Sequence, residues 1–225
     1  MKTTKSVIIR MGIMLVIAAL LVGALAVTVS AETQTLSYVE RTVNPSTKAV
    51  TATTKSVTAT VVTASDTVLG EAGKETYYVV SSETTIDKYV TVNGTVHLII
   101  GAKYDLGTKN ITVPEGATLH IHEASGVSGA SLNLNAINLK SESSNVYIHG
   151  GTVNATGPIG TTGVNGFGDV VIYGGTITAK NIGVGATDFG DVTANLVGIY
   201  GGNITVNTDT YLVPAIGMTG GDIKT

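Results

Sequence analysis

The chain has 225 residues, of which 28 are glycine, 13% are charged and none is cysteine or tryptophan, and its formal net charge is −3. This composition is too apolar for a wholly disordered protein and too rich in glycine for an ordinary helical domain, and it excludes disulfides and thiolate metal sites. Because the last arginine is Arg41, no nucleic-acid partner is expected.

The N-terminus has the pattern of an export signal. Three basic residues precede an apolar run over residues 11–27, and small side chains follow up to Ala31. We expect residues 1–31 to be a signal peptide cleaved after Ala31, which places the protein outside the cell or on the cell surface. The alternative is an uncleaved anchor, which would be the protein's membrane contact.

Residues 32–75 are rich in Thr, Val, Ser and Ala and contain a near-duplication, with residues 47–53 resembling residues 54–60. The apolar side chains in this segment are small, so it offers little material for a core. An extended linker or stalk is the first interpretation. The second is an edge strand that lies on the following domain.

A repeat organises the rest of the chain. Residues 145–155, 169–179 and 196–206 share one order of residue types around a Gly-Gly pair, and the pairs begin at 150, 174 and 201, which are 24 and 27 residues apart. Repeats of this length predict a β-solenoid in which each repeat forms one coil. We therefore expect an all-β domain over residues 76–225.

Period-two alternation predicts which side chains of each repeat point into the coil. The expected inward columns are Val146/Val170/Val197, Ile148/Ile172/Ile199, Val153/Ile177/Ile204 and Ala155/Ala179/Val206. Paired glycines are expected at the corner because a side chain there would clash or forbid a positive φ.

Short strands separated by tight turns are predicted through the whole domain. They cover residues 89–92, 96–100, 110–113, 117–122, 131–134, 136–140, 145–149, 152–155, 169–173, 176–179, 196–200 and 203–206. Ile-Gly-x-x-Gly segments at 159–163, 182–186 and 216–220 are interpreted as connecting arms. On this interpretation the solenoid is incomplete at its C-terminal end, and self-association through that open end would cover its unpaired strands.

With these repeats, the chain resembles the Gly-rich right-handed parallel β-helix proteins found as adhesin-like and carbohydrate-binding surface proteins of prokaryotes. The resemblance covers residues 86–221 and includes the lead-in segments 96–101 and 114–121. It implies a carbohydrate-binding surface protein, and some relatives bind acidic polysaccharides through calcium. Some relatives are similar in shape to pectate lyases, and this chain differs from those lyases because its body lacks any Arg or basic cluster that could act as the base beside a uronic acid.

The residues that precede the Gly-Gly pairs are candidate carbohydrate-binding residues. His149, Tyr173 and Tyr200 should stack on the outer face as a strip of rings, on which sugars pack their C–H groups. The alternative is an aromatic ladder that only stabilises the sheet.

Candidate metal ligands are few. His120 and His122 share one face of a predicted strand, but a third ligand is not identifiable from the sequence. Asp169, Asp188 and Asp191 lie near loops and offer carboxylates of the kind that bind calcium, although no calcium-binding motif is present.

No pair of carboxylates stands out as a catalytic pair, so no enzymatic activity is expected. Four glycosylation sequons begin at Asn93, Asn110, Asn154 and Asn203. The function expected from the sequence is an exported, non-enzymatic, adhesin-like protein that binds a polysaccharide or cell-surface glycan. The alternative is a self-assembling structural subunit of a filament, sheath or surface layer.

Overall fold

The computed structural model describes residues 31–161, 168–184, 197–207, 217–218 and 222–224. In these ranges the regular structure consists of strands, and none of them holds a helix that could cross a membrane. The prediction of a signal peptide falls on residues outside the described ranges. Residues 32–225 form one compact unit.

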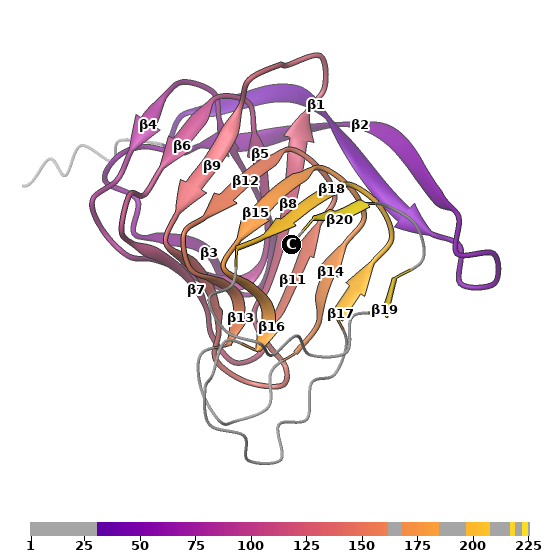
Figure 1. Cartoon of the computed structure of the whole chain (residues 1–225). Coiled ribbons are helices and arrows are strands. Elements are labelled where there is room, and N and C mark those ends of the chain that lie inside the picture. The colour runs from indigo at the N-terminus through magenta and orange to yellow at the C-terminus, as the bar shows by residue number, and fades with distance from the viewer. Residues whose placement is uncertain (1–30, 162–167, 185–196, 208–216, 219–221, 225) are drawn as a thin grey trace, which may run out of the picture. The chain divides into compact units, whose positions relative to one another are not determined.

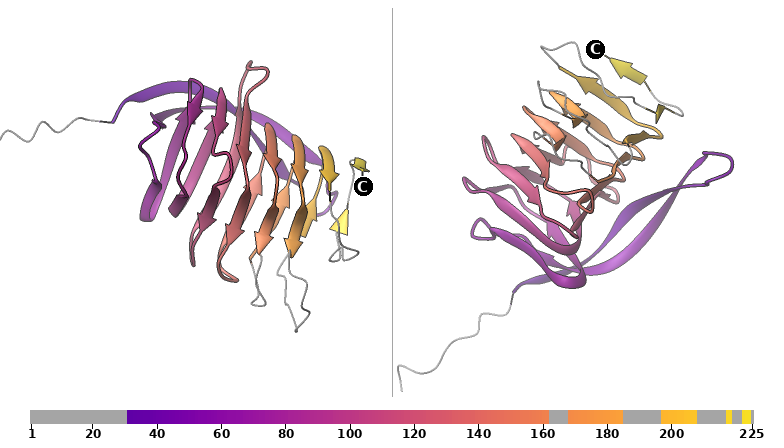
Figure 2. Two further views of the ribbon diagram at one scale, coloured as in Figure 1. Left: turned by 60° about the vertical axis from the view of Figure 1, so that its left-hand side comes forward. Right: turned by 90° about the horizontal axis from the view of Figure 1, so that it is seen from below.

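The strands wind into a β-solenoid of about five turns, which confirms the predicted architecture. Its parallel strands form three faces (Figures 1 and 2). The first face contains β5 (Val90–Ile100), β8 (Thr118–Ala124), β11 (Asn145–Ile148), β14 (Val170–Ile172), β17 (Val197–Ile199) and β19 (Gly217–Met218).

The second face is a separate sheet. It contains β4 (Thr84–Thr85), β6 (Lys103–Asp105), β9 (Ser131–Leu134), β12 (Thr152–Ala155), β15 (Thr176–Ala179), β18 (Asn203–Val206) and β20 (Asp222–Lys224). The third face contains β7 (Asn110–Val113), β10 (Ala136–Leu139), β13 (Pro158–Thr161) and β16 (Asn181–Val184). The long strands β3 (Val68–Val80) and β5 connect the first and third faces into one sheet.

The register places equivalent residues of successive repeats side by side. Val146 pairs with Val170, and Val170 pairs with Val197 on the first face. On the second face, Ile177 lies between Val153 and Ile204. These side chains are buried, so the predicted inward columns are confirmed, and burial of each contributes roughly 1.5–3 kcal/mol before the entropy cost of ordering the coil.

Two predictions about the connecting segments were wrong. Residues 158–161 and 181–184 form β13 and β16, which are strands of the third face rather than arms. Gly217 and Met218 do not belong to a third arm either, since Gly217 pairs with Gly198 and Met218 with Ile199. β20 follows Gly220-Gly221 in the sequence and pairs with β18, so it continues the second face.

The segment before the solenoid is not a free linker. β1 (Thr33–Val43) and β2 (Val50–Val61) form a long antiparallel hairpin, in which the two near-duplicate segments fall mostly on the turn and β2. β1 pairs with β8 through Tyr38 and Val39, and β2 pairs with β3. The hairpin runs across the strands of successive coils (Figure 2).

A second, smaller core holds this hairpin in place. The buried side chains are Tyr38, Ala59, Val79, Ile99 and Ala124, and they lie outside the solenoid's own core. The sequence interpretation of residues 32–75 missed this core because Val79 and Ile99 alternate with inward residues and belong to outward positions of the first face. The outer side of that face is therefore partly covered by protein.

Candidate functional site: the histidine–tyrosine ladder

Two parallel rows of aromatic rings run along the outer side of the first face. They follow from strand alternation, because residues at positions i and i+2 share a face and successive coils are in register. The first row contains Tyr77, His97, His120 and Tyr147, and the second row contains His122, His149, Tyr173 and Tyr200. We call the two rows together the ring ladder.

The rings of the ladder are stacked closely. In the first row, His97 lies with its ring centroid 4.4 Å from those of both Tyr77 and His120, and its plane is within 4° of the His120 plane. In the second row, the His122 and His149 centroids are 4.3 Å apart. These distances lie at the lower limit of the range, roughly 4.5–7 Å, in which aromatic pairs attract one another beyond simple burial.

The hairpin covers the histidine part of the ladder. Tyr38 of β1 meets His122 edge to face, with the centroids 4.7 Å apart. Arg41 forms an ion pair with Glu123 (Nη2 to Oε1, 2.6 Å) and donates a hydrogen bond to the carbonyl of His149. As a result His122 is 0% exposed and His149 is 5% exposed.

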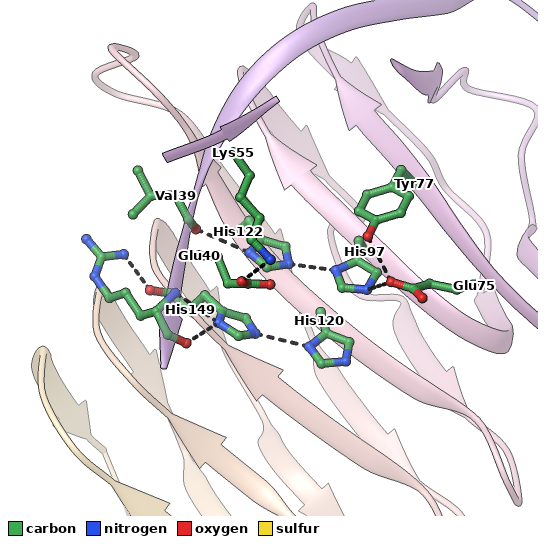
Figure 3. A network of polar contacts seen from close by, with 10 residues as sticks. Val39, Glu40, Lys55, Glu75, Tyr77, His97, His120, His122 and His149 are labelled. Atoms are coloured by element: carbon green, nitrogen blue, oxygen red, sulfur yellow. Dashed lines mark hydrogen bonds and ion pairs between the residues drawn. The ribbon is translucent and has the colours of Figure 1, made fainter. Parts of the chain in front are cut away.

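Hydrogen bonds connect the imidazoles in pairs (Figure 3). His97 Nδ1 lies 3.0 Å from His122 Nε2, and His120 Nδ1 lies 3.0 Å from His149 Nε2. The outer nitrogens contact main-chain carbonyls of β1: His122 Nδ1 is 3.3 Å from Val39 O, and His149 Nδ1 is 2.8 Å from Arg41 O. The hairpin thus helps to orient both pairs.

Burial keeps these histidines neutral. It lowers the pKa of His120 to about 3, of His122 to about 2 and of His149 to about 4, because a charged imidazole is poorly solvated under the hairpin. Burial also lowers the pKa of His97, although the Glu75 carboxylate, 3.0 Å from His97 Nε2, acts in the opposite direction.

The predicted carbohydrate-binding residues lie together in the second row, but they differ in exposure. The His149 and Tyr173 centroids are 5.0 Å apart, and those of Tyr173 and Tyr200 are 5.8 Å apart with planes within 15°. His149 lies under Arg41 and is buried, whereas Tyr173 and Tyr200 are partly exposed. In the second row, the surface that a ligand can reach is therefore the end formed by Tyr173 and Tyr200, which we call the tyrosine end of the ladder.

Sequence reasoning missed several residues of the site, among them His97, Arg41 and Glu75. His97 lies on the same face as His120 one coil earlier, and the unequal lengths of the early coils hid that register. Arg41 and Glu75 come from β1 and β3, which were assigned wholly or mainly to a linker. The signal that was available is that all four histidines of the chain fall on outward positions of predicted strands.

Of the three predicted calcium ligands, Asp169 is the one that lies within the described residues. Asp169 accepts a hydrogen bond from the Tyr147 hydroxyl (3.3 Å), while Asp188 and Asp191 lie outside the described residues. Among the sequons, Asn93 and Asn203 are exposed. Asn110 and Asn154 are partly buried, with side chains bonded to neighbouring asparagines, Asn135 and Asn133 respectively.

A cleft of about 140 Å³ lies beside the Gly-Gly corners. Its lining includes Glu123, Thr152 and Thr176, together with the glycines of two corners. Small and polar walls of this kind offer hydrogen-bonding groups but little apolar surface.

Comparison with protein families, with curated proteins and with solved structures found no match for this chain.

Proposed function

We propose that this chain is an exported, non-enzymatic surface protein that binds carbohydrate at the tyrosine end of the ring ladder. The observation that carries the proposal is the pair Tyr173 and Tyr200, whose nearly parallel rings repeat from one coil to the next and are partly exposed. Sugars pack C–H groups on such rings while their hydroxyls form hydrogen bonds.

Three further features support a binding surface here. Gly198 has no side chain, and a Cβ at this position would lie 3.0 Å from the Tyr200 ring, so the glycine leaves room for that ring. The corner cleft, with Thr152, Thr176 and Glu123, adds hydrogen-bonding groups on the next face. The resemblance to prokaryotic right-handed β-helix surface proteins agrees with a glycan ligand and with an extracellular location.

The test is glycan-array binding by the purified full chain. We expect binding to at least one polysaccharide class and its loss in the double variant Tyr173→Ala/Tyr200→Ala. Tyr89→Ala is the matched control, because Tyr89 is 60% exposed and lies outside the ladder. This control should bind like the unmodified chain.

Two outcomes would contradict the proposal. One is the absence of binding to any glycan by the unmodified chain. The other is a double variant that binds normally but unfolds more easily, because that result would mean that the tyrosines only stabilise the sheet. Concentration-dependent assembly in size-exclusion chromatography, without glycan binding, would instead favour a self-assembling structural subunit.

A further inference from the structure

The buried end of the ring ladder gathers nitrogen ligands from two coils. The chain contains four histidines, and all of them lie in the ladder. His97, His120 and His122 each offer a ring nitrogen, and these three nitrogens lie within 4.8 Å of one another. His97 and His122 are buried and His120 is partly buried, so the group is largely separated from bulk water.

The polar contacts of His97 and His122 need one hydrogen more than the two neutral rings can supply. Three contacts follow one another: Val39 O to His122 Nδ1 (3.3 Å), His122 Nε2 to His97 Nδ1 (3.0 Å), and His97 Nε2 to Glu75 Oε1 (3.0 Å). Both ends of this row are acceptors, and two neutral imidazoles supply only two hydrogens. A bound cation removes the mismatch, because both rings can then donate outward and direct a lone pair inward.

We propose that His97, His120 and His122 form a binding site for a late first-row divalent cation such as zinc or copper. Imidazole nitrogen is a preferred ligand for these ions, whereas calcium and magnesium prefer oxygen. Three protein ligands with water in a fourth position is a common zinc arrangement. Ligand nitrogens in a tetrahedral site are roughly 3.4 Å apart. The three histidine nitrogens now lie within 4.8 Å of one another, so small rotations of the imidazoles bring them to that distance.

The contacts around these imidazoles have the character of an outer coordination shell. Histidines that bind metals usually donate their other N–H to a carboxylate or a main-chain carbonyl. His97 has the Glu75 carboxylate for this purpose, and His122 has the Val39 carbonyl. His120 contacts His149, which in turn contacts the Arg41 carbonyl.

Metal binding and hairpin docking are therefore linked. The Val39 carbonyl belongs to β1, and so does Tyr38, whose ring lies against His122. If the hairpin leaves, His122 loses its outer partner and the site opens to water. By linkage, a cation that binds only the docked form stabilises the docked hairpin.

The test is isothermal titration of the full chain, first stripped with a chelator, with zinc and separately with copper, with calcium as the negative control. We expect one zinc or copper ion per chain, no calcium, and at least tenfold weaker binding in His97→Gln and in His122→Gln. Tyr147→Phe is the matched control, since Tyr147 stacks on His120 in the same ladder, lies outside the three-nitrogen group and keeps its ring in this variant. This control should change affinity by less than about threefold, because it removes neither a ligand nor the outer partner of a ligand.

Hydrogen exchange of the unmodified chain gives a readout that does not depend on whether variants fold. Zinc should slow amide exchange in β1 and leave β12 and β15 unchanged. The proposal is overturned if neither zinc nor copper binds the unmodified chain, if His122→Gln binds as tightly as the unmodified chain, or if Tyr147→Phe weakens binding as much as the histidine variants do.

Discussion

Glycine at the second position of each Gly-Gly corner meets two constraints at once. Gly151, Gly175 and Gly202 have φ values of 90°, 105° and 105°, a region that other residues rarely adopt. A Cβ at Gly202 would also lie 2.7 Å from the carbonyl oxygen of Gly175, and one at Gly175 would lie 2.5 Å from that of Gly151. These carbonyls accept main-chain hydrogen bonds from the next coil, at Thr176 and Asn203, so they cannot move away freely.

Gly175→Ala should therefore destabilise the chain more than an alanine in an open turn does. Backbone strain and the clash together cost about 2–5 kcal/mol. Gly116→Ala is the control, since Gly116 has a φ of 71° but a Cβ added there would meet no atom within 4 Å, which leaves strain of about 1–2 kcal/mol. Urea unfolding followed by circular dichroism measures both, and equal losses would contradict the role of the close approach.

At the first two corners, the first glycine leaves room for the Arg41 side chain. A Cβ at Gly174 would lie 3.1 Å from Arg41 Cδ, and a Cβ at Gly150 would meet the Arg41 guanidinium. These glycines thus leave space for the side chain that joins the hairpin to Glu123 and to the His149 carbonyl. The repeat in the sequence identified the corner but gave no sign of the arginine, which lies far away in the chain.

At the scale of elements, Tyr38 is the largest buried side chain in the core that holds the hairpin. Tyr38 is 2% exposed and packs on Val79, Ile99 and the His122 ring. Most side chains toward the hairpin turn are exposed and contribute little packing. The stability of hairpin docking should thus depend on Tyr38 more than on the length of β1 and β2.

Tyr38→Ala should release the hairpin without unfolding the coils. Loss of a buried aromatic side chain costs about 3–5 kcal/mol, which is concentrated in the second core. Hydrogen exchange should become faster in β1 and β2 and stay slow in β12 and β15. Ser37→Ala, at the exposed neighbouring position, should leave all four strands protected. Faster exchange throughout the chain after Tyr38→Ala would show that the hairpin is part of one cooperative unit with the solenoid.

The predictability of this fold followed the regularity of the repeats. Strands around the corners were predicted within one or two residues, because each coil repeats the same alternation of aliphatic side chains. β13 and β16 were missed because glycines interrupt them, at Gly160 and Gly183, where alternation is not visible. The hairpin was missed since Thr and Val suit both an extended linker and a strand.

The candidate site was only half predictable for a related reason. Tyr173 and Tyr200 are equivalent positions of aligned repeats, so their proximity follows from the repeat itself. The cluster of His97 with His120 and His122 depends on the register between β5 and β8, which lie before the regular repeats. The burial of this cluster depends on the docking of β1, which no pattern in the local sequence indicates.

At the scale of the whole molecule, the buried histidines should make the stability of the metal-free chain depend on pH. His120 and His149 form one pair that needs no extra proton, since two neutral rings supply one hydrogen for each of the two contacts, His120 Nδ1 to His149 Nε2 and His149 Nδ1 to Arg41 O. Glu75, Glu123 and Arg41 are the charged groups that face the cluster, and the Glu40–Lys55 ion pair lies beside it.

The sign follows from the pKa of each state. In the unfolded chain histidine titrates near 6.5, whereas burial lowers the pKa of His120 to about 3 and of His149 to about 4 in the folded chain. As the pH falls below about 6.5 the unfolded chain takes up protons that the folded chain does not, so the free energy of unfolding decreases. Between about pH 7 and pH 5 the loss is roughly 2 kcal/mol for each histidine that stays neutral.

Urea unfolding with a chelator at both pH values measures this loss of unfolding free energy, and His120→Gln should show a smaller difference. Equal stability at the two pH values would mean that the cluster takes up protons without opening.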